Sequence, residues 1–190
     1  MKTFTLATSL VLLAAGAADA LTVRGSVAGG NLPPDLRVAG VVVTPFGQVV
    51  QEVSSVPVEK GQFSLELPVT APTARAQVTL TPQNVNWPGV IDPVQVSGPA
   101  QVAELKLFTY RDQNNNGRRD ENETLREAMA DVRGANLFVV WVNTDVNVTA
   151  SKGFEAGLKR GWNAFLVDVG RAVNVQPFTD TTVVTVRLGR

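Results

Sequence analysis

Residues 103–123 read A-E-L-K-L-F-T-Y-R-D-Q-N-N-N-G-R-R-D-E-N-E. The first part, Ala103 to Tyr110, follows the alternating pattern of a β-strand and lacks helical periodicity. The second part, residues 112–123, is a run of acceptor side chains around a single glycine. A strand that runs directly into such a segment predicts a polar loop held between β-strands.

The loop has the spacing of a twelve-residue EF-hand. That template needs oxygen-bearing side chains at positions one, three, five, nine and twelve, a glycine at six and a backbone carbonyl at seven. These positions are filled by Asp112, Asn114, Asn116, Asp120, Glu123, Gly117 and Arg118. Calcium takes about 6–8 oxygen ligands, so the spacing predicts one bound Ca²⁺. The alternative is an ordinary polar turn, because Asn-Gly clusters are common turn chemistry. Arg119 occupies position eight, which is usually apolar in paired EF-hands, so we expect a single loop and not a sensor pair.

The first twenty residues have the pattern of an export signal. Lys2 is followed by an apolar run, Phe4 to Ala18, and Ala18-Asp19-Ala20 fits an A-x-A cleavage site. We therefore expect the mature chain to start at Leu21, with no transmembrane segment after removal of the signal. The expected location is the periplasm, the periphery of the outer membrane or the cell surface.

The composition excludes several classes of function. The chain has no cysteine and no histidine, which removes Ser-His-Asp and Cys-His catalysis and His-ligated zinc. Seventeen basic residues balance seventeen acidic ones, whereas a nucleic-acid-binding protein usually has a basic excess. We expect no enzyme activity and no nucleic-acid partner.

Short runs rich in valine and threonine, separated by glycine and proline, predict an all-β fold. The expected strands before the loop are 21–27, 38–44, 48–53, 62–67, 76–81 and 101–110. Gln62 to Leu67 alternates most clearly, with Phe63 and Leu65 on its apolar face. Regular short strands favour antiparallel β-sandwiches of the prealbumin or immunoglobulin kind. We expect a signal at 1–20, one sandwich at 21–103 and a second, with the loop, at 104–190; a single merged sandwich is the alternative.

The segments after the loop differ in character. Thr124 to Ala130 is compatible with one or two helical turns, while Leu137 to Val142 (L-F-V-V-W-V) predicts a central strand covered on both faces. Further strands are expected at 146–150, 153–159, 161–169 and 182–188. The last of these is either an edge strand available for docking or an ordinary inner strand.

A strand, then D-x-N-x-N-G-x-x-D-x-x-E, then an apolar strand resembles the calcium-binding B-type repeats of bacterial serine–aspartate surface adhesins. It is also similar to prealbumin-like and carboxypeptidase-regulatory-like sandwiches of envelope proteins. The resemblance covers about residues 104–142 and implies that the acceptor residues of the loop ligate a calcium ion that stiffens a sandwich. The segment 124–133 is longer than the Gly-rich turn of that family.

Two other kinds of site are weighed against this one. Tyr110, Trp87, Trp141 and Trp162 are candidates for a sugar-stacking platform, although core packing is the simpler role for aromatic residues. Of these, Trp141 is expected in the core and Trp87, in a Pro-rich stretch, on the surface. A carboxylate pair for glycoside hydrolysis is the weakest possibility. Its candidates are Asp35, Glu52, Glu66, Asp92, Asp145, Glu155, Asp168 and Asp180.

The sequence thus predicts an exported, non-enzymatic structural or interaction protein of the bacterial cell envelope, stabilised by one calcium ion. Its expected partner is another envelope protein, such as a surface-layer or outer-membrane assembly. The alternative is a calcium-stabilised carbohydrate-binding module with a glycan as its ligand.

Overall fold

The computed structural model describes residues 20–189, and these residues form β-strands, turns and three short 3₁₀ turns, without an α-helix. The strands are β1 (Thr22–Ala28), β2 (Leu36–Val43), β3 (Val49–Pro57), β4 (Gln62–Glu66), β5 (Val78–Thr79), β6 (Gln95–Val96), β7 (Gln101–Arg111), β8 (Arg126–Val132), β9 (Ala135–Val142), β10 (Val146–Thr149), β11 (Glu155–Leu158), β12 (Gly161–Val169), β13 (Val173–Pro177) and β14 (Val183–Leu188). The 3₁₀ turns are Ala74–Ala76, Pro82–Asn84 and Ser151–Gly153. The predicted all-β class is confirmed. The predicted export signal lies, except for Ala20, outside the described residues.

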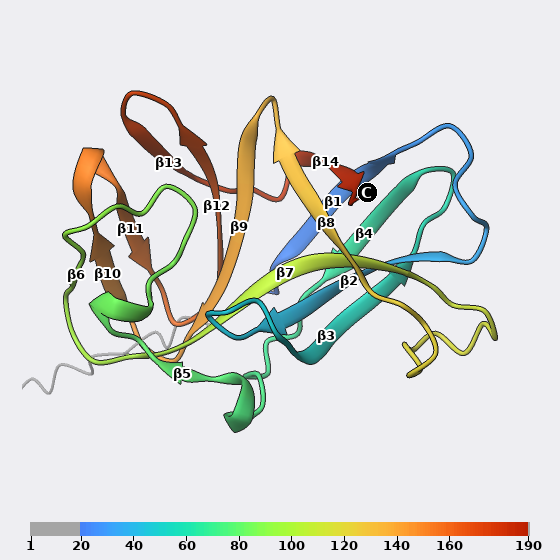
Figure 1. Ribbon diagram of the computed structural model, residues 1–190, viewed down its shortest axis with the longest axis horizontal. Coiled ribbons are helices and arrows are strands. Elements are labelled where there is room, and N and C mark those ends of the chain that lie inside the picture. The colour runs from blue at the N-terminus through green and yellow to red at the C-terminus, as the bar shows by residue number, and fades with distance from the viewer. Residues whose placement is uncertain (1–19, 190) are drawn as a thin grey trace, which may run out of the picture.

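Eleven strands form one mixed sheet (Figure 1). Its main order is β13-β12-β9-β7-β8-β14-β1-β4, and β2, β3 and β5 join it through β7. β1 and β14 pair in parallel, whereas the other ladders are antiparallel. The remaining strands, β11, β10 and β6, form a separate three-stranded sheet.

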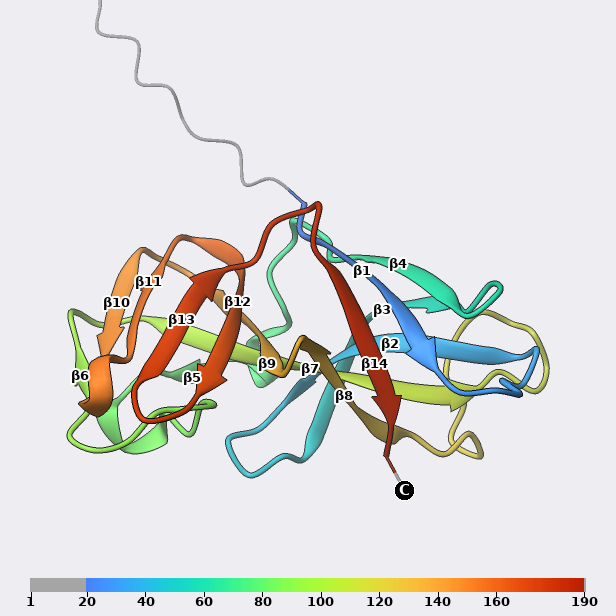
Figure 2. The same ribbon diagram turned by 90° about the horizontal axis from the view of Figure 1, so that it is seen from above.

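The molecule has two lobes (Figure 2). We call the part built from β1 to β4, β8, β14 and the second half of β7 the loop lobe. Its strands curl around a core that includes Val38, Leu65, Leu105 and Val186, and the curled sheet is nearly barrel-like. β3 and β4 follow each other in the chain but do not pair, and an isolated bridge between Glu59 and Gln62 lies in the turn between them, so the curled sheet is not closed there.

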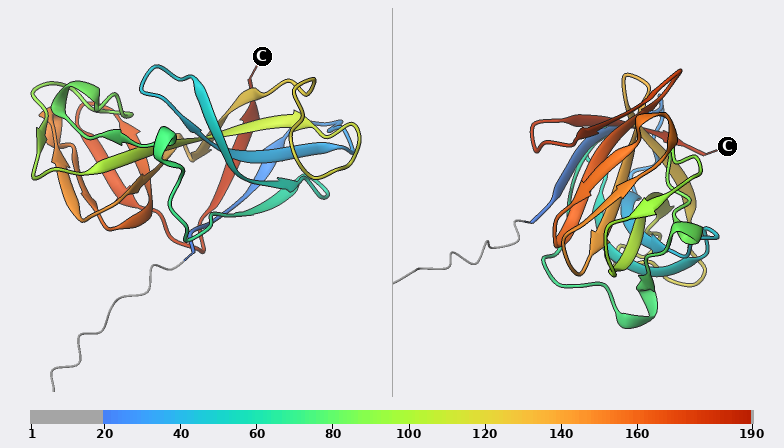
Figure 3. Two further views of the ribbon diagram at one scale, coloured as in Figure 1. Left: turned by 90° about the horizontal axis from the view of Figure 1, so that it is seen from below. Right: turned by 90° about the vertical axis from the view of Figure 1, so that its left-hand side faces the viewer.

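The second part, built from β5, β6 and β10 to β13, is called the small-sheet lobe. Its core includes Trp87, Phe138, Val148, Phe154 and Phe165. The views in Figure 3 show the three-stranded sheet facing the strands of the large sheet in this lobe. The core is therefore enclosed between the two sheets.

β9 lies between the lobes and is buried on both faces. Phe138, Val140 and Val142 point into the small-sheet core, while Val139 belongs to the core of the loop lobe. The strand pairs with β12 along one edge and with β7 and β8 along the other. The prediction of a central strand at 137–142, covered on both faces, is confirmed.

The boundary expected near residue 103 falls inside β7. Strands that precede this boundary in the sequence pair with strands at or after it, because β1 pairs with β14 and β2 pairs with β7. The two lobes consequently do not correspond to residues 21–103 and 104–190. The physical reason is that long strands such as β7 and β9 serve both cores, which local sequence patterns do not reveal.

Three predictions about individual segments are decided by the structure. The helical turns expected at 124–130 are wrong: residues 126–132 form β8, with Ala128 and Ala130 buried and Met129 exposed, because they pair with β14 and β7. The alternation predicted for 62–67 is confirmed by β4, where Phe63 and Leu65 are buried. The C-terminal run is an inner strand between β1 and β8, and the docking-edge alternative is therefore wrong.

Candidate functional site

The 112–123 loop connects β7 to β8 at the end of the loop lobe farthest from the small-sheet lobe (Figure 1). All six residues predicted as calcium ligands lie in it. Asp112 is the first residue after β7. Its position is fixed because Tyr110 pairs with β2 in the sheet and the Asp112 N–H donates to the Asp35 carbonyl at 2.9 Å. The start of the loop is thus fixed by the sheet.

Asp112 organises the first half of the loop. Its Oδ1 accepts the Asn116 N–H at 3.0 Å, and its Oδ2 accepts the Gly117 N–H at 2.9 Å. Gly117 has φ of +77°, the left-handed conformation that glycine adopts without strain. The sharp turn predicted at position six is therefore present at Gly117.

Glu123 organises the second half in the same way. Its Oε1 accepts the Gln113 N–H at 2.8 Å, and its Oε2 accepts the Asp120 N–H at 2.9 Å. Glu123 and Asp112 are only 2% and 3% exposed. Carboxylates so deeply buried are rare unless they are paired or hydrogen-bonded, and here both are held by backbone N–H groups of the loop itself.

The remaining predicted residues gather around Asp120. The side-chain amides of Asn114 and Asn116 both donate to Asp120 Oδ2, at 2.6 and 2.9 Å. The side-chain Oδ1 of Asn116 in turn accepts the Arg118 N–H at 2.8 Å. The structure therefore brings Asp112, Asn114, Asn116, Asp120 and Glu123 into one hydrogen-bonded loop, with Arg118 on its exposed side.

Two arginines place positive charge against this loop. Arg37, on β2, has its Nη1 at 3.5 Å from Asp112 Oδ2. Arg119 donates its Nε to the Glu123 carbonyl at 2.9 Å. The arginines offset part of the negative charge of the three loop carboxylates.

A polar layer from β3 and β7 lies beneath the loop. Ser55 Oγ and Tyr110 Oη are 3.0 Å apart, and Ser55 Oγ also donates to the Gly117 carbonyl at 3.4 Å. Glu52 completes the layer: its Oε2 is fully buried without a hydrogen-bond partner, and burial raises its pKa. No local sequence pattern identifies Arg37, Glu52 and Ser55 as neighbours of the loop, because they are separated from it by more than fifty residues of chain.

The oxygen atoms that the loop offers as ligands suit a hard cation. They are carboxylate and amide oxygens, the ligand type that Ca²⁺ takes, and the two most buried carboxylates bracket the loop. Within residues 20–189, no three His, Cys, Asp or Glu side chains converge as a metal-binding group. A cation in this loop would consequently depend on Asn114 and Asn116 as well as on the acidic residues.

The aromatic residues do not form an exposed platform. Trp87, Trp141 and Tyr110 are buried, and Trp162 is partly buried with its indole N–H donating to the Pro68 carbonyl at 3.0 Å. The prediction that Trp141 is core is confirmed. The prediction that Trp87 is exposed is wrong, because its ring packs on Phe138 with centroids 5.0 Å apart. Its Pro-rich segment folds over the small-sheet core.

Two of the scattered acidic residues form ion pairs at the surface. Asp35 pairs with Arg111 and Asp145 with Lys159, both at 2.9 Å. Hydrogen bonds from these cations hold the pKa of Asp35 and of Asp145 below the ordinary value. Carboxylates held in the ionised form by a cation are poorly suited to act as the general acid of a glycosidase.

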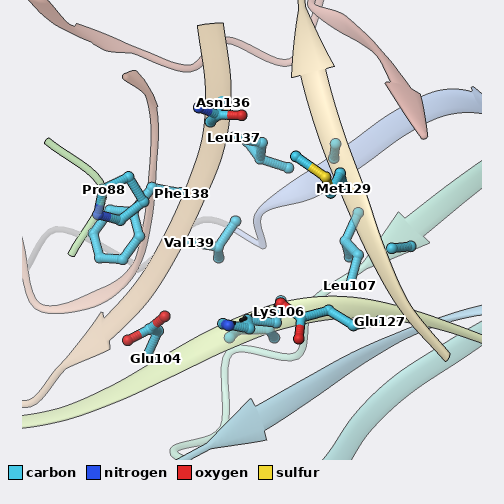
Figure 4. A pocket seen from close by; sticks show the side chains of 13 residues that line it. Pro88, Glu104, Lys106, Leu107, Glu127, Met129, Asn136, Leu137, Phe138 and Val139 are labelled. Atoms are coloured by element: carbon cyan, nitrogen blue, oxygen red, sulfur yellow. Dashed lines mark hydrogen bonds and ion pairs between the residues drawn. The ribbon is translucent and has the colours of Figure 1, made fainter. Parts of the chain in front are cut away.

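A slot of about 180 Å³ opens where β7, β8 and β9 diverge (Figure 4). Leu107 and Val139 line its apolar part, and Glu104, Lys106 and Glu127 lie at its rim. Lys106 Nζ pairs with Glu127 Oε1 at 2.8 Å, whereas burial raises the pKa of Glu104. The slot contains none of the predicted ligand residues.

No protein-family model, curated protein or solved structure matches this chain. Among residues 20–189, no helix is long and apolar enough to cross a membrane.

Proposed function

We propose that this protein is an exported, non-enzymatic structural or interaction protein of the bacterial cell envelope, and that its 112–123 loop binds one calcium ion. The observation that carries the calcium proposal is the burial of Asp112 and Glu123. These residues occupy positions one and twelve of the template, and both turn their carboxylates toward backbone groups of the loop. The ion would neutralise the three carboxylates and tie the two halves of the loop together.

Calcium acts here as a stiffening element between β7 and β8. The loop bridges the two strands where they separate, so a cross-link between Asp112 and Glu123 would hold the end of the lobe together. In this proposal the curled sheet of the loop lobe is a β-sandwich, as in the adhesin repeats and prealbumin-like modules that the loop resembles. The absence of histidine and cysteine from the chain supports a non-catalytic role.

The partner in this proposal is a larger envelope protein, such as a component of a surface-layer or outer-membrane assembly. The predicted export signal supports the location. A carbohydrate-binding module is less well supported, because the aromatic side chains that would stack on sugars are buried or partly buried. Affinity capture from envelope extract and a glycan array distinguish the two: one enriched envelope protein without a glycan signal supports our proposal, and the reverse pattern contradicts it.

Calorimetric titration of the mature chain with calcium tests the metal site. Only Asp112, Asp120 and Glu123 are charged ligands, and Arg118 and Arg119 lie beside them, so we expect weak binding, with Kd on the order of 10⁻⁴–10⁻³ M. Asp112→Ala should abolish the binding heat. Glu121→Ala is the matched control, because Glu121 is an exposed acidic residue of the same loop at a position without a ligand role. Equal heats for Asp112→Ala and Glu121→Ala would place the ion elsewhere.

A further inference from the structure

Arg37 is placed under the loop so that it faces one of the predicted calcium ligands. Its guanidinium is 3.5 Å from Asp112 Oδ2, and its side chain is 14% exposed. The same Oδ2 atom accepts the Gly117 N–H at 2.9 Å. A cation bound by Asp112 would therefore share this carboxylate with a buried positive charge.

β3 holds Arg37 from the opposite side. Arg37 Nη2 donates to the Ser55 carbonyl at 3.1 Å and approaches Ser55 Oγ at 3.3 Å. The first contact is to the backbone of β3, whereas the Ser55 hydroxyl itself donates to the Gly117 carbonyl of the loop. Arg37 thus has a fixed attachment that remains when its contact with Asp112 is lost.

Glu52 lies on β3, the strand that also carries Ser55, the hydrogen-bond partner of Arg37. Burial raises the pKa of Glu52, and the charge of Glu123 adds to the rise. A hydrogen bond from Ser55 and the charges of Arg37 and Arg119 oppose this rise of the pKa. Glu52 Oε2 is fully buried and has no hydrogen-bond partner. An unpartnered carboxylate oxygen in a buried layer is costly, and a guanidinium that turned toward it could satisfy it with a charge-assisted hydrogen bond.

We propose that Arg37 is the built-in competitor of calcium, and that Glu52 is the counter-charge that accommodates Arg37 when the ion is bound. This inference rests on the proposed calcium function. Without the ion, Arg37 neutralises Asp112 and keeps the loop ordered. With the ion, the positive charge of Arg37 is balanced by Glu52, and Ser55 keeps the guanidinium in place through its hydrogen bonds. The two residues set the calcium affinity without ligating the ion.

Because Arg37 and Glu52 carry opposite charges, neutralising each of them should change the calcium affinity in opposite directions. Arg37→Gln keeps a hydrogen-bonding amide but removes a positive charge close to the ion, so the calcium affinity should rise by about tenfold. Arg37→Lys keeps the charge and should bind calcium within about threefold of the wild type. Glu52→Gln removes the counter-charge and should weaken binding by about three- to tenfold.

Calorimetric calcium titrations of the wild type and the three variants test the inference, with denaturation in chelator confirming that each variant is folded. Tighter binding by Arg37→Gln together with weaker binding by Glu52→Gln supports it. If the wild type binds and Arg37→Gln binds equally or more weakly, Arg37 is not a competitor, while the calcium function stands. If Arg37→Gln does not fold, Glu52→Gln decides: an unchanged affinity overturns the inference. A wild type that releases no heat overturns the calcium function and this inference together.

Discussion

The two lobes are stabilised by different kinds of interaction. The small-sheet lobe has a core of apolar side chains, and the fully buried carboxylates of the described residues, Asp112, Glu123 and Asp131, all belong to the loop lobe. Asp131 is paired with Arg187 of β14, whereas Asp112 and Glu123 depend on the loop. Apolar packing responds little to ions, but buried carboxylates respond strongly to the charges around them. We therefore expect calcium to affect the loop lobe and to leave the small-sheet lobe unchanged.

The largest effect is expected from the strand that closes the loop lobe. Val184 and Val183 are neighbours on β14, but Val184 is fully buried and Val183 is 60% exposed. Val184→Asp places a charge in the core and should abolish the cooperative unfolding transition, as should deletion of residues 182–190. Val183→Asp is the matched control and should shift stability by about 0.5 kcal/mol or less. Denaturation followed by circular dichroism measures all three, and a deletion variant that still unfolds cooperatively would contradict the inner-strand role of β14.

The next largest effect is expected from a substitution in the core of the small-sheet lobe. Phe138 packs on Trp87 in the small-sheet core, so Phe138→Ala should cost about 3–5 kcal/mol of stability. Phe46, at the tip of the β2–β3 hairpin, is 90% exposed, and Phe46→Ala serves as the matched control with almost no loss. The loss caused by Phe138→Ala should be equal in calcium and in chelator. If the loss of stability differs between calcium and chelator, then calcium also affects the small-sheet lobe, which contradicts the comparison of the two lobes.

A smaller effect is expected from the loop in the absence of calcium. Glu123→Ala leaves the N–H groups of Gln113 and Asp120 without their acceptors, which should cost about 1–3 kcal/mol. The exposed Glu121 again supplies the control, since Glu121→Ala removes no such contact. Urea denaturation in chelator measures the loss. If Glu123→Ala and Glu121→Ala are equally stable, the loop hydrogen bonds do not contribute.

The smallest effect concerns the pH dependence of stability at the slot. Burial raises the pKa of Glu104, so the folded protein binds this proton more tightly than the unfolded chain does. The contribution of Glu104 to stability is then greatest in acid and declines as the pH rises from about 4.5 through the raised pKa. Glu104→Gln should lack this decline and gain less than about 1 kcal/mol over the wild type at neutral pH. Urea denaturation of both proteins across this pH range is the measurement, and parallel curves would contradict the assignment.

The correct sequence predictions are those that depend on local pattern. The alternation of 62–67 and the apolar run 137–142 identify β4 and β9, because strand periodicity is visible within a few residues. Gly117 adopts the expected left-handed turn because its conformation is a local property. The all-β class follows from the same short-range signals.

The missed features depend on contacts between distant segments. The parallel pairing of β1 with β14 joins the two ends of the described chain, and the contact of Arg37 with Asp112 joins β2 to the residue that follows β7. Trp87 is buried because an irregular segment covers a core formed far away in sequence. β8 is a strand, despite a sequence compatible with helical turns, because its neighbours β7 and β14 supply hydrogen-bond partners.

The most direct test of the central claim is the free energy of unfolding of the wild type in millimolar calcium and in chelator, measured beside Asp112→Ala. A weak ligand that binds only the folded state should raise the stability of the wild type by about 1–3 kcal/mol. We predict this gain for the wild type and for Glu121→Ala, and none for Asp112→Ala. The same calcium-dependent gain in Asp112→Ala, or no gain in the wild type, would contradict a calcium site in the 112–123 loop.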